Sequence, residues 1–87
     1  MVYTYIVQCA DGTLYTGWAA DLEKRLATHN AGTGAKYTRN RLPVELVYYE
    51  HQENQSAAQK REANIKKLKR CQKLALITDF VKMGKDF

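Results

Sequence analysis

The dipeptide Asp11-Gly12 lies between two runs of β-branched and aromatic residues, and it constrains the fold of this chain more than any other feature. Asp-Gly flanked by such runs is a strong short signal for a β-hairpin. The runs Val2–Gln8 and Thr13–Trp18 contain the residue types that are enriched in strands. The sequence therefore predicts that the chain begins with two antiparallel strands joined by a tight turn.

The length of the hairpin loop decides which side chains share a face of the sheet. A two-residue loop would put Tyr5 and Tyr15 on opposite faces, because side chains alternate along a strand. A three-residue loop over residues 10–12 requires Gly12 at positive φ and puts both tyrosines on one face. We expect the three-residue register, in which Gly17 leaves room for the Tyr5 ring. Its pairs are Cys9 with Thr13, Val7 with Tyr15, and Tyr5 with Gly17.

A helix is predicted directly after the hairpin, from a cap at Asp21 to about Asn30. At about 100° per residue, one face of this helix carries two apolar and two polar side chains. They are Leu22, Arg25, Leu26 and His29. Since a face buried in the core would not normally include an arginine, we expect Arg25 and His29 to contribute to a site beside the hairpin.

The segment from Ala31 to Pro43 combines two glycines with basic side chains. It is interpreted either as a solvated connection with one helical turn or as a basic flap that contacts phosphates. The flap interpretation is favoured, with an aromatic ring available for stacking on a base. Its residues are Lys36, Tyr37, Arg39 and Arg41.

The remaining sequence predicts a third strand and two more helices. The strand is Val44–Tyr49, and a polar turn over Gln52–Gln55 precedes a capping-box pattern at Ser56–Gln59. A final helix, from about Cys71 to Val81 and ended by Gly84, is expected to close the core with Leu74, Ile77 and Val81. The predicted fold class is α+β: one domain over residues 1–87, with a small three-stranded, mostly antiparallel sheet flanked by helices in the order β-β-α-β-α-α.

Charge and cysteine content restrict the possible partners. The chain of 87 residues has 14 Lys+Arg and 9 Asp+Glu, which gives a net charge of +5 and favours nucleic acid over a membrane surface. Lys66 and Lys67 on the second predicted helix are expected to contact phosphates. Cys9 and Cys71 form no metal-type pair and are expected to be buried thiols in a reducing cytoplasm. No apolar run is long enough to span a bilayer.

Glu62 shares the inner face of the second predicted helix with Ala58 and Ile65. A carboxylate on an apolar face is costly unless it is paired. Its partner is either Arg25 or a lysine, which is the more common situation for a single glutamate, or a hard cation such as Mg²⁺ or Mn²⁺. His29 is likewise either a core histidine with both nitrogens bonded or a group that moves a proton.

Taken together, the triplets Tyr3-Thr4-Tyr5 and Tyr15-Thr16-Gly17 and the later Arg25, His29 and Glu62 resemble the GIY-YIG nuclease domain. The resemblance covers about residues 2 to 80. It is closest to small stand-alone bacterial members, which are related to the catalytic subunits of structure-specific flap endonucleases. The first triplet departs from the family pattern at Tyr3 and Thr4, and the second at Thr16.

This resemblance implies a metal-dependent endonuclease that hydrolyses DNA, including branched or damaged DNA, in repair or recombination. Tyr15 would be the base for the attacking water, with Tyr5 alongside it and His29 as a proton relay. Arg25 would bind a phosphate oxygen, and Glu62 would hold the magnesium that stabilises the leaving 3′ oxygen. Two alternatives stay open: a catalytically weak module that binds DNA or RNA, and an interaction subunit whose protein partner supplies specificity.

Overall fold

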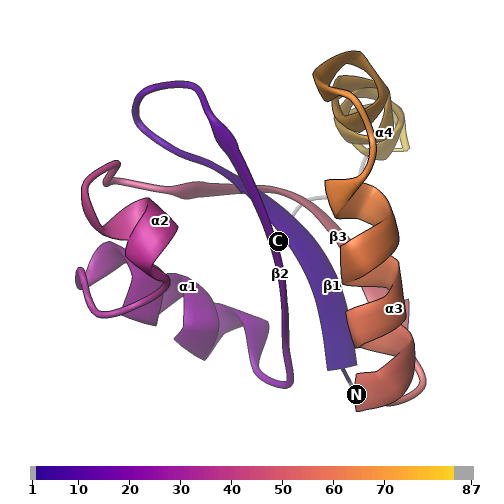
Figure 1. Ribbon diagram of the computed structural model, residues 1–87, viewed down its shortest axis with the longest axis horizontal. Helices are drawn as coiled ribbons and strands as arrows, with labels where there is room; N and C mark the ends of the chain where they lie inside the picture. Colours follow the sequence, from indigo (N-terminus) through magenta and orange to yellow (C-terminus); the bar gives the residue numbers. More distant parts are fainter. Residues whose placement is uncertain (1, 84–87) are drawn as a thin grey trace.

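The computed structural model describes residues 2–83 and contains three strands and four helices in this range. The strands are β1 (Val2–Gln8), β2 (Leu14–Ala19) and β3 (Glu45–Gln52). The helices are α1 (Leu22–Asn30), α2 (Lys36–Arg39), α3 (Gln55–Lys66) and α4 (Arg70–Lys82) (Figure 1). The predicted order of elements is confirmed, and α2 is a single helical turn inside the segment from Ala31 to Pro43, where one of the two interpretations included such a turn. Within residues 2–83, no helix is long and apolar enough to cross a membrane.

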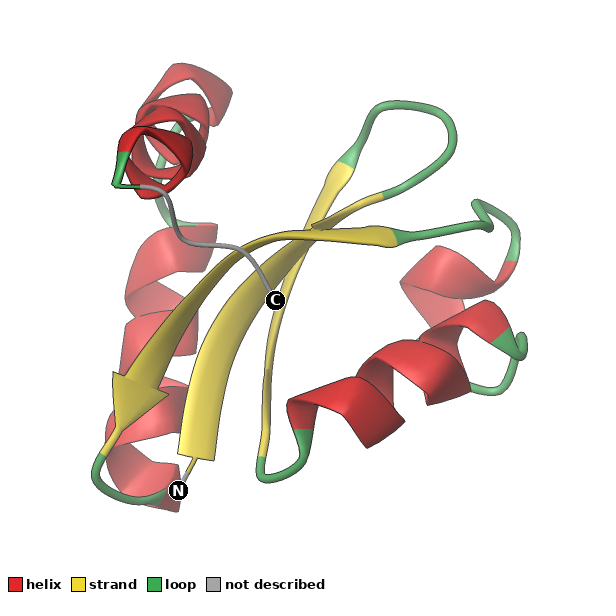
Figure 2. Ribbon diagram, turned by 180° about the vertical axis from the view of Figure 1, so that it is seen from behind, coloured by secondary structure: helices red, strands yellow, loops and turns green. Residues whose placement is uncertain are grey.

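The sheet is antiparallel and has the strand order β2-β1-β3, so the first strand lies in the centre. Helices α1 and α2 lie on one side of it, and α3 lies on the other (Figures 1 and 2). The predicted α+β class with helices flanking a three-stranded sheet is therefore confirmed. One consequence of the strand order is that β2 is an edge strand, accessible between α1 and α3.

The hairpin has the three-residue register. Gly12 has φ of 86°, the left-handed conformation that the loop requires. The observed pairs are Tyr5 with Gly17, Val7 with Tyr15 and, through a backbone hydrogen bond of 2.8 Å, Cys9 with Thr13. Tyr5 and Tyr15 consequently lie on the same face of the sheet, the face that α1 covers.

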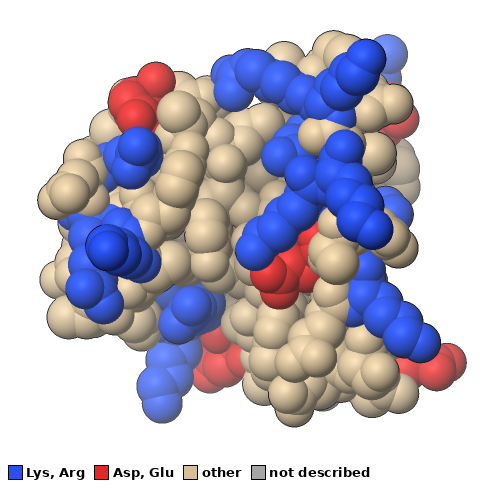
Figure 3. Space-filling view, in the orientation of Figure 1, with Lys and Arg blue, Asp and Glu red and all other residues tan. Residues whose placement is uncertain are grey.

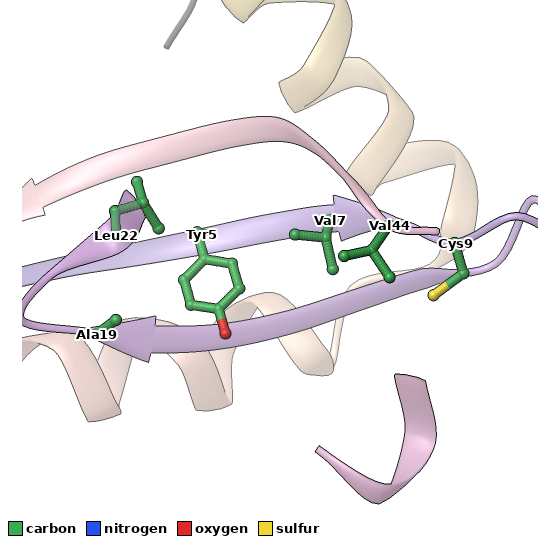
Figure 4. Packing of buried hydrophobic residues seen from close by; sticks show 6 residues of the cluster. All are labelled: Tyr5, Val7, Cys9, Ala19, Leu22 and Val44. Carbon is green, nitrogen blue, oxygen red and sulfur yellow. The ribbon is translucent and has the colours of Figure 1, made fainter. Parts of the chain in front are cut away.

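Both faces of the central strand are buried, because β1 has helices on either side. Toward α1, the core consists of Tyr5, Val7, Cys9, Ala19, Leu22 and Val44 (Figure 4). Toward α3, the fully buried residues Ile6, Ala58 and Ile65 form a second layer, and Thr4 Oγ1 donates to the Ala58 carbonyl at 3.0 Å. Because both faces are covered, Thr4–Val7 is a continuous buried run, and buried and exposed residues do not alternate along it.

The helix predicted to begin with a cap at Ser56 begins earlier. Its N-cap is Asn54, whose side chain accepts a hydrogen bond from the Ala57 amide at 2.8 Å. Strand β3 also runs to Gln52, beyond the predicted end at Tyr49. The capping box at Ser56 is therefore wrong, because the asparagine two residues upstream is the better cap in this geometry.

The predicted core face of the last helix is also wrong. Leu74 and Val81 are 40% and 65% exposed, whereas Phe80 is buried against the rings of Tyr48 and Tyr49. The helix has apolar residues on several sides, so periodicity did not select one face; its approach to β3 did. Cys71 is exposed as well, which contradicts the expectation of two buried thiols, while Cys9 is buried. Gly84, the predicted end of this helix, lies outside the described residues.

We predict that Gly17→Ala destabilises the fold. The added methyl carbon would lie 2.7 Å from Tyr5 Oη and 2.9 Å from Tyr5 Cζ. Over-packing of this kind costs about 1–3 kcal/mol, measurable as a lower free energy of unfolding in urea. The matched control repeats the change in a Tyr5→Phe background, which lacks the nearest contact atom and should lose less. Equal losses in the two backgrounds would contradict this packing.

Candidate active site

The two tyrosines of the hairpin meet the polar residues of α1 at one place. The Tyr5 hydroxyl lies 2.8 Å from His29 Nε2, and Arg25 Nε donates to the same hydroxyl at 3.4 Å. The Tyr15 ring contacts the His29 imidazole edge-on, with centroids 5.6 Å apart. The structure thus brings together all four residues that the sequence analysis placed beside the hairpin.

His29 is fully buried, and both of its ring nitrogens have partners. The Thr38 hydroxyl donates its proton to the Ala35 carbonyl at 2.9 Å, so it accepts from His29 Nδ1 at 3.0 Å. The other nitrogen, Nε2, is then the acceptor for the Tyr5 hydroxyl. Burial, with a smaller contribution from the Arg25 charge, lowers the pKa of His29 and favours the neutral imidazole. The hydrogen bonds then decide which of its nitrogens carries the proton.

The Tyr5 phenol is held in its protonated form. Burial raises the pKa of Tyr5, and the nearby Tyr15 and Glu62 add to the rise, while Arg25 opposes it. The hydrogen bond to Tyr5 is also the main cause of a raised pKa at Arg25. Tyr5 therefore donates its proton to His29 and accepts from a permanently charged guanidinium.

Glu62 approaches from α3, on the other side of the sheet. Its side chain is 20% exposed, and its Oε2 lies 2.7 Å from the Nζ of Lys66, one turn further along the helix. The Lys66 ammonium lies 5.8 Å from the centroid of the Tyr15 ring. Of the protein partners expected for Glu62, a lysine is the one observed, and the pair faces the tyrosine at the edge strand.

A cation at this position would depend on Glu62 and on oxygens from outside the protein. Within residues 2–83, no three His, Cys, Asp or Glu side chains cluster closely enough to hold a metal ion. Magnesium is typically held by one or two carboxylates, with waters and substrate phosphates completing its shell. A partly buried carboxylate that already has a cation as its partner fits this chemistry.

The basic segment between α1 and β3 is docked against the site rather than projecting into solvent. The Tyr37 ring stacks on Tyr15 with centroids 5.8 Å apart, and the Arg41 guanidinium lies 4.3 Å from the Tyr37 centroid. Arg41 also pairs with Asp11 of the hairpin loop at 3.1 Å, and Arg39 donates to the Gly34 carbonyl. Lys36 and Arg39 remain exposed.

Thr38 and Gly34 are site residues that the sequence analysis did not single out. A Cβ at position 34 would lie 2.5 Å from His29 Nδ1, so only glycine permits this close approach. Thr38 is fully buried and orients the imidazole. Both lie in a glycine-containing polar segment, where no local pattern distinguishes a buried threonine from a solvated one.

Basic side chains border the site on both sides. Lys and Arg gather over α1 and α2 on one side and along α3 and α4 on the other, with a band of uncharged surface between them (Figure 3). A cleft of about 520 Å³ opens beside the site, and Arg25 contributes to its wall. The other charged, hydroxyl or aromatic residues of this wall are Trp18, Asp21, Lys24 and Thr28. The cleft therefore meets the site at Arg25, which can bind an anion from either.

A family model described as the GIY-YIG catalytic domain matches residues 1–75. The chain belongs to the GIY-YIG family. It is therefore a member of a family of nuclease domains, which bind nucleic acid and generally use a divalent metal. The Tyr5, Tyr15, Arg25, His29 and Glu62 constellation lies entirely within the matched region.

Similar proteins come from several bacteria. The chain is 59% identical over 85 residues to a UPF0213 protein of Streptococcus pyogenes, which covers 97% of this chain and 92% of that protein. It is 60% identical over 78 residues to a UPF0213 protein of Clostridium perfringens, covering 90% and 84%. Two solution NMR structures are similar: the UPF0213 protein of Bacillus halodurans (39% identity, TM-score 0.57, covering 90% and 84%) and a protein of E. faecalis (46%, 0.60, covering 90% and 83%).

We predict that His29 makes the stability of this GIY-YIG domain dependent on pH. Folding lowers the pKa of His29, so the unfolded chain binds more protons than the folded chain below about pH 6.5. The stabilising contribution is complete above this pH and decreases as the pH falls toward the folded-state pKa. Urea unfolding at a series of pH values should show this decrease in the wild type.

The matched variants for this prediction are His29→Gln and His51→Gln. The exposed His51 leaves the buried network untouched, so His51→Gln should retain the decrease that His29 causes. His29→Gln should lose that decrease, although it is less stable at every pH. If His29→Gln kept the wild-type pH dependence between pH 7 and pH 5, the assignment to His29 would be wrong.

Proposed function

We propose that this chain is a divalent-metal-dependent endonuclease that hydrolyses phosphodiester bonds of DNA. The observation that carries the proposal is the convergence of five polar side chains at the edge strand β2. Two come from the hairpin, two from α1 and one from α3: Tyr5, Tyr15, Arg25, His29 and Glu62. Phosphodiester hydrolysis requires a base, a cation for the phosphoryl oxygens and stabilisation of the leaving oxygen, and this set contains groups for each task.

Tyr15 is the phenol that suits the role of base. The proton of the other phenol, Tyr5, is committed to His29 Nε2, and burial raises the pKa of Tyr5. Tyr15 is less buried than Tyr5 and lies at the edge strand, where substrate and water can reach it. We assign Tyr15 to the attacking water and Tyr5 to positioning its neighbours through its two hydrogen bonds.

Arg25 and His29 have complementary tasks. The Arg25 guanidinium is only partly buried and borders the cleft, so it can bind a non-bridging phosphate oxygen while still donating to Tyr5. The neutral His29 accepts from Tyr5 at Nε2 and can take up a proton there, while its Nδ1–H stays bonded to Thr38. A divalent cation held by Glu62 would stabilise the charge on the leaving 3′ oxygen.

The basic side chains around the site support a nucleic-acid substrate. Lys36 and Arg39 on one side and Lys66 and Lys67 on the other are exposed, and they can contact phosphates without specifying sequence. Arg41 and Tyr37 contribute by holding the segment in place against Asp11 and Tyr15. We propose DNA as the substrate.

A second candidate function is a nucleic-acid-binding module with weak catalysis. It is favoured by contacts that the proposed catalytic residues already make within the protein: Glu62 pairs with Lys66, and Tyr37 stacks on Tyr15. Cleavage assays on branched and single-stranded DNA, each with and without Mg²⁺, separate the two functions. Binding without cleavage on every substrate would favour the module.

We predict that Tyr15→Phe reduces cleavage by about 100- to 10,000-fold, the usual contribution of a general base. The ring and its stack with Tyr37 are retained, so the melting temperature and the affinity for DNA should change little. Tyr3→Phe is the matched control, because Tyr3 is on the same face of the sheet but contacts Tyr49 and His51 instead of the site. A Tyr15→Phe protein as active as Tyr3→Phe would contradict the base assignment.

We predict that Glu62→Gln lowers the affinity for Mg²⁺ and lowers cleavage by orders of magnitude, because the proposed site loses its carboxylate. DNA binding should persist and weaken with rising salt, since the lysines and arginines contact phosphates independently. The measurements are a Mg²⁺ titration and a melting curve for both proteins. An unchanged Mg²⁺ affinity together with a lower melting temperature would show that Glu62 serves only as the ion-pair partner of Lys66.

A further inference from the structure

The Lys66 ammonium is bound to the carboxylate of Glu62, the residue proposed above as the ligand of a divalent cation. Nζ lies 2.7 Å from Glu62 Oε2, and the same nitrogen lies 5.8 Å from the centroid of the Tyr15 ring. The ammonium therefore lies close to both the proposed metal ligand and the proposed base. Lys66 is half-exposed, with 49% of its side chain accessible, so it can leave this position without disturbing the core.

We propose that Lys66 is an internal competitor of the divalent cation, and that a substrate phosphate releases Glu62 by drawing the ammonium away. This inference rests on the proposed function, in which Glu62 is the metal ligand. It adds a role for Lys66 that differs from a simple phosphate contact. In the free protein the Lys66 ammonium pairs with Glu62. In the complex the same ammonium pairs with a phosphate of the nucleic acid.

The energetics allow this exchange. Fully exposed Glu–Lys pairs four residues apart on a helix are weak, and their strength corresponds to about a two-fold preference for the paired state. Because the Glu62 side chain is only 20% exposed, two-fold is a lower bound for this pair. A lysine is a compact charge on a flexible stem, so it can turn from a carboxylate to a phosphate at small cost. A phosphate bound by Arg25 would lie near Tyr15, within reach of the same ammonium. Occupation of Glu62 by a cation and of the site by DNA then favour each other.

The first test measures Mn²⁺ binding to the protein without nucleic acid. Lys66→Gln should bind Mn²⁺ at least about two-fold more tightly than Lys67→Gln, because only the former removes the competitor of Glu62. Lys67→Gln is the matched control: it removes the same charge one residue away, and within residues 2–83 Lys67 has no ion pair. Equal Mn²⁺ affinities of the two variants would overturn the proposal.

A third variant, Glu62→Gln, separates this proposal from the proposed function. If Glu62→Gln loses Mn²⁺ affinity while the two lysine variants are equal, Glu62 is the ligand and the role of Lys66 as competitor is wrong. If Glu62→Gln binds Mn²⁺ as the wild type does, the metal assignment itself fails, and the competition fails with it. Tighter binding by Lys66→Gln, together with loss of binding by Glu62→Gln, supports both.

The second test is a double-mutant cycle on DNA affinity, with EDTA present to exclude metal. In the wild type, Lys66 must leave Glu62 before it contacts a phosphate, so Lys66→Gln should weaken binding less than it does in a Glu62→Gln background. We expect a difference of at least about two-fold for Lys66, set by the strength of the pair, and none of that size for Lys67. Additive effects of the Glu62 and Lys66 substitutions would overturn the exchange.

Discussion

The number of residues in the loop of the first hairpin is the constraint on which the rest of the site depends, because it decides which side chains share a face of the sheet. With Gly12 at φ of 86°, the loop has three residues, and Tyr5 and Tyr15 point to the same face of the sheet. A slip of one residue would send one of them to the α3 side. Gly17, opposite Tyr5, lacks the side chain that would collide with the phenol, so the ring lies over the edge strand (Figure 4). A turn of the backbone thus decides whether two phenols can act together.

The buried imidazole then joins this hairpin to the two helices beside it. A fully buried histidine is costly unless both nitrogens are hydrogen-bonded, and here Tyr5 and Thr38 satisfy them. Helix α2 has only four residues and would not be stable alone; Thr38 and the Tyr37–Tyr15 stack hold it against the hairpin and α1. The bonds that keep this segment folded are those that fix the tautomer of His29, so structure and chemistry cannot be changed separately here.

Features set by the geometry of one helix or one hairpin could be predicted from the sequence. Features set by contacts between separate helices and strands could not. The α1 face with Arg25 and His29 follows from helix periodicity. The hairpin register follows from strand alternation once a single site is taken to require Tyr5 and Tyr15 on one face, and both features are observed. Phe80 on α4 and the Thr38 contact with His29 depend on how separate elements meet, which a period in the sequence does not encode. The choice of Lys66 as the partner of Glu62 is intermediate: the four-residue spacing permits it, but Arg25 was an equal alternative before the fold was known.

The reason that Arg25 is not this partner lies in the positions of the two helices (Figures 1 and 2). Helices α1 and α3 lie on opposite sides of the sheet, so Arg25 is held by Tyr5 on one side of β2 and Glu62 by Lys66 on the other. Had the two groups paired directly, they would neutralise each other, and the guanidinium would not be available to a phosphate or the carboxylate to a cation. In the proposed function, the two groups can therefore act on one phosphodiester from opposite sides of β2. The placement of α1 and α3 on opposite sides of the sheet thereby keeps the two charges apart, and in the structure Lys66 neutralises Glu62 through an ion pair within α3.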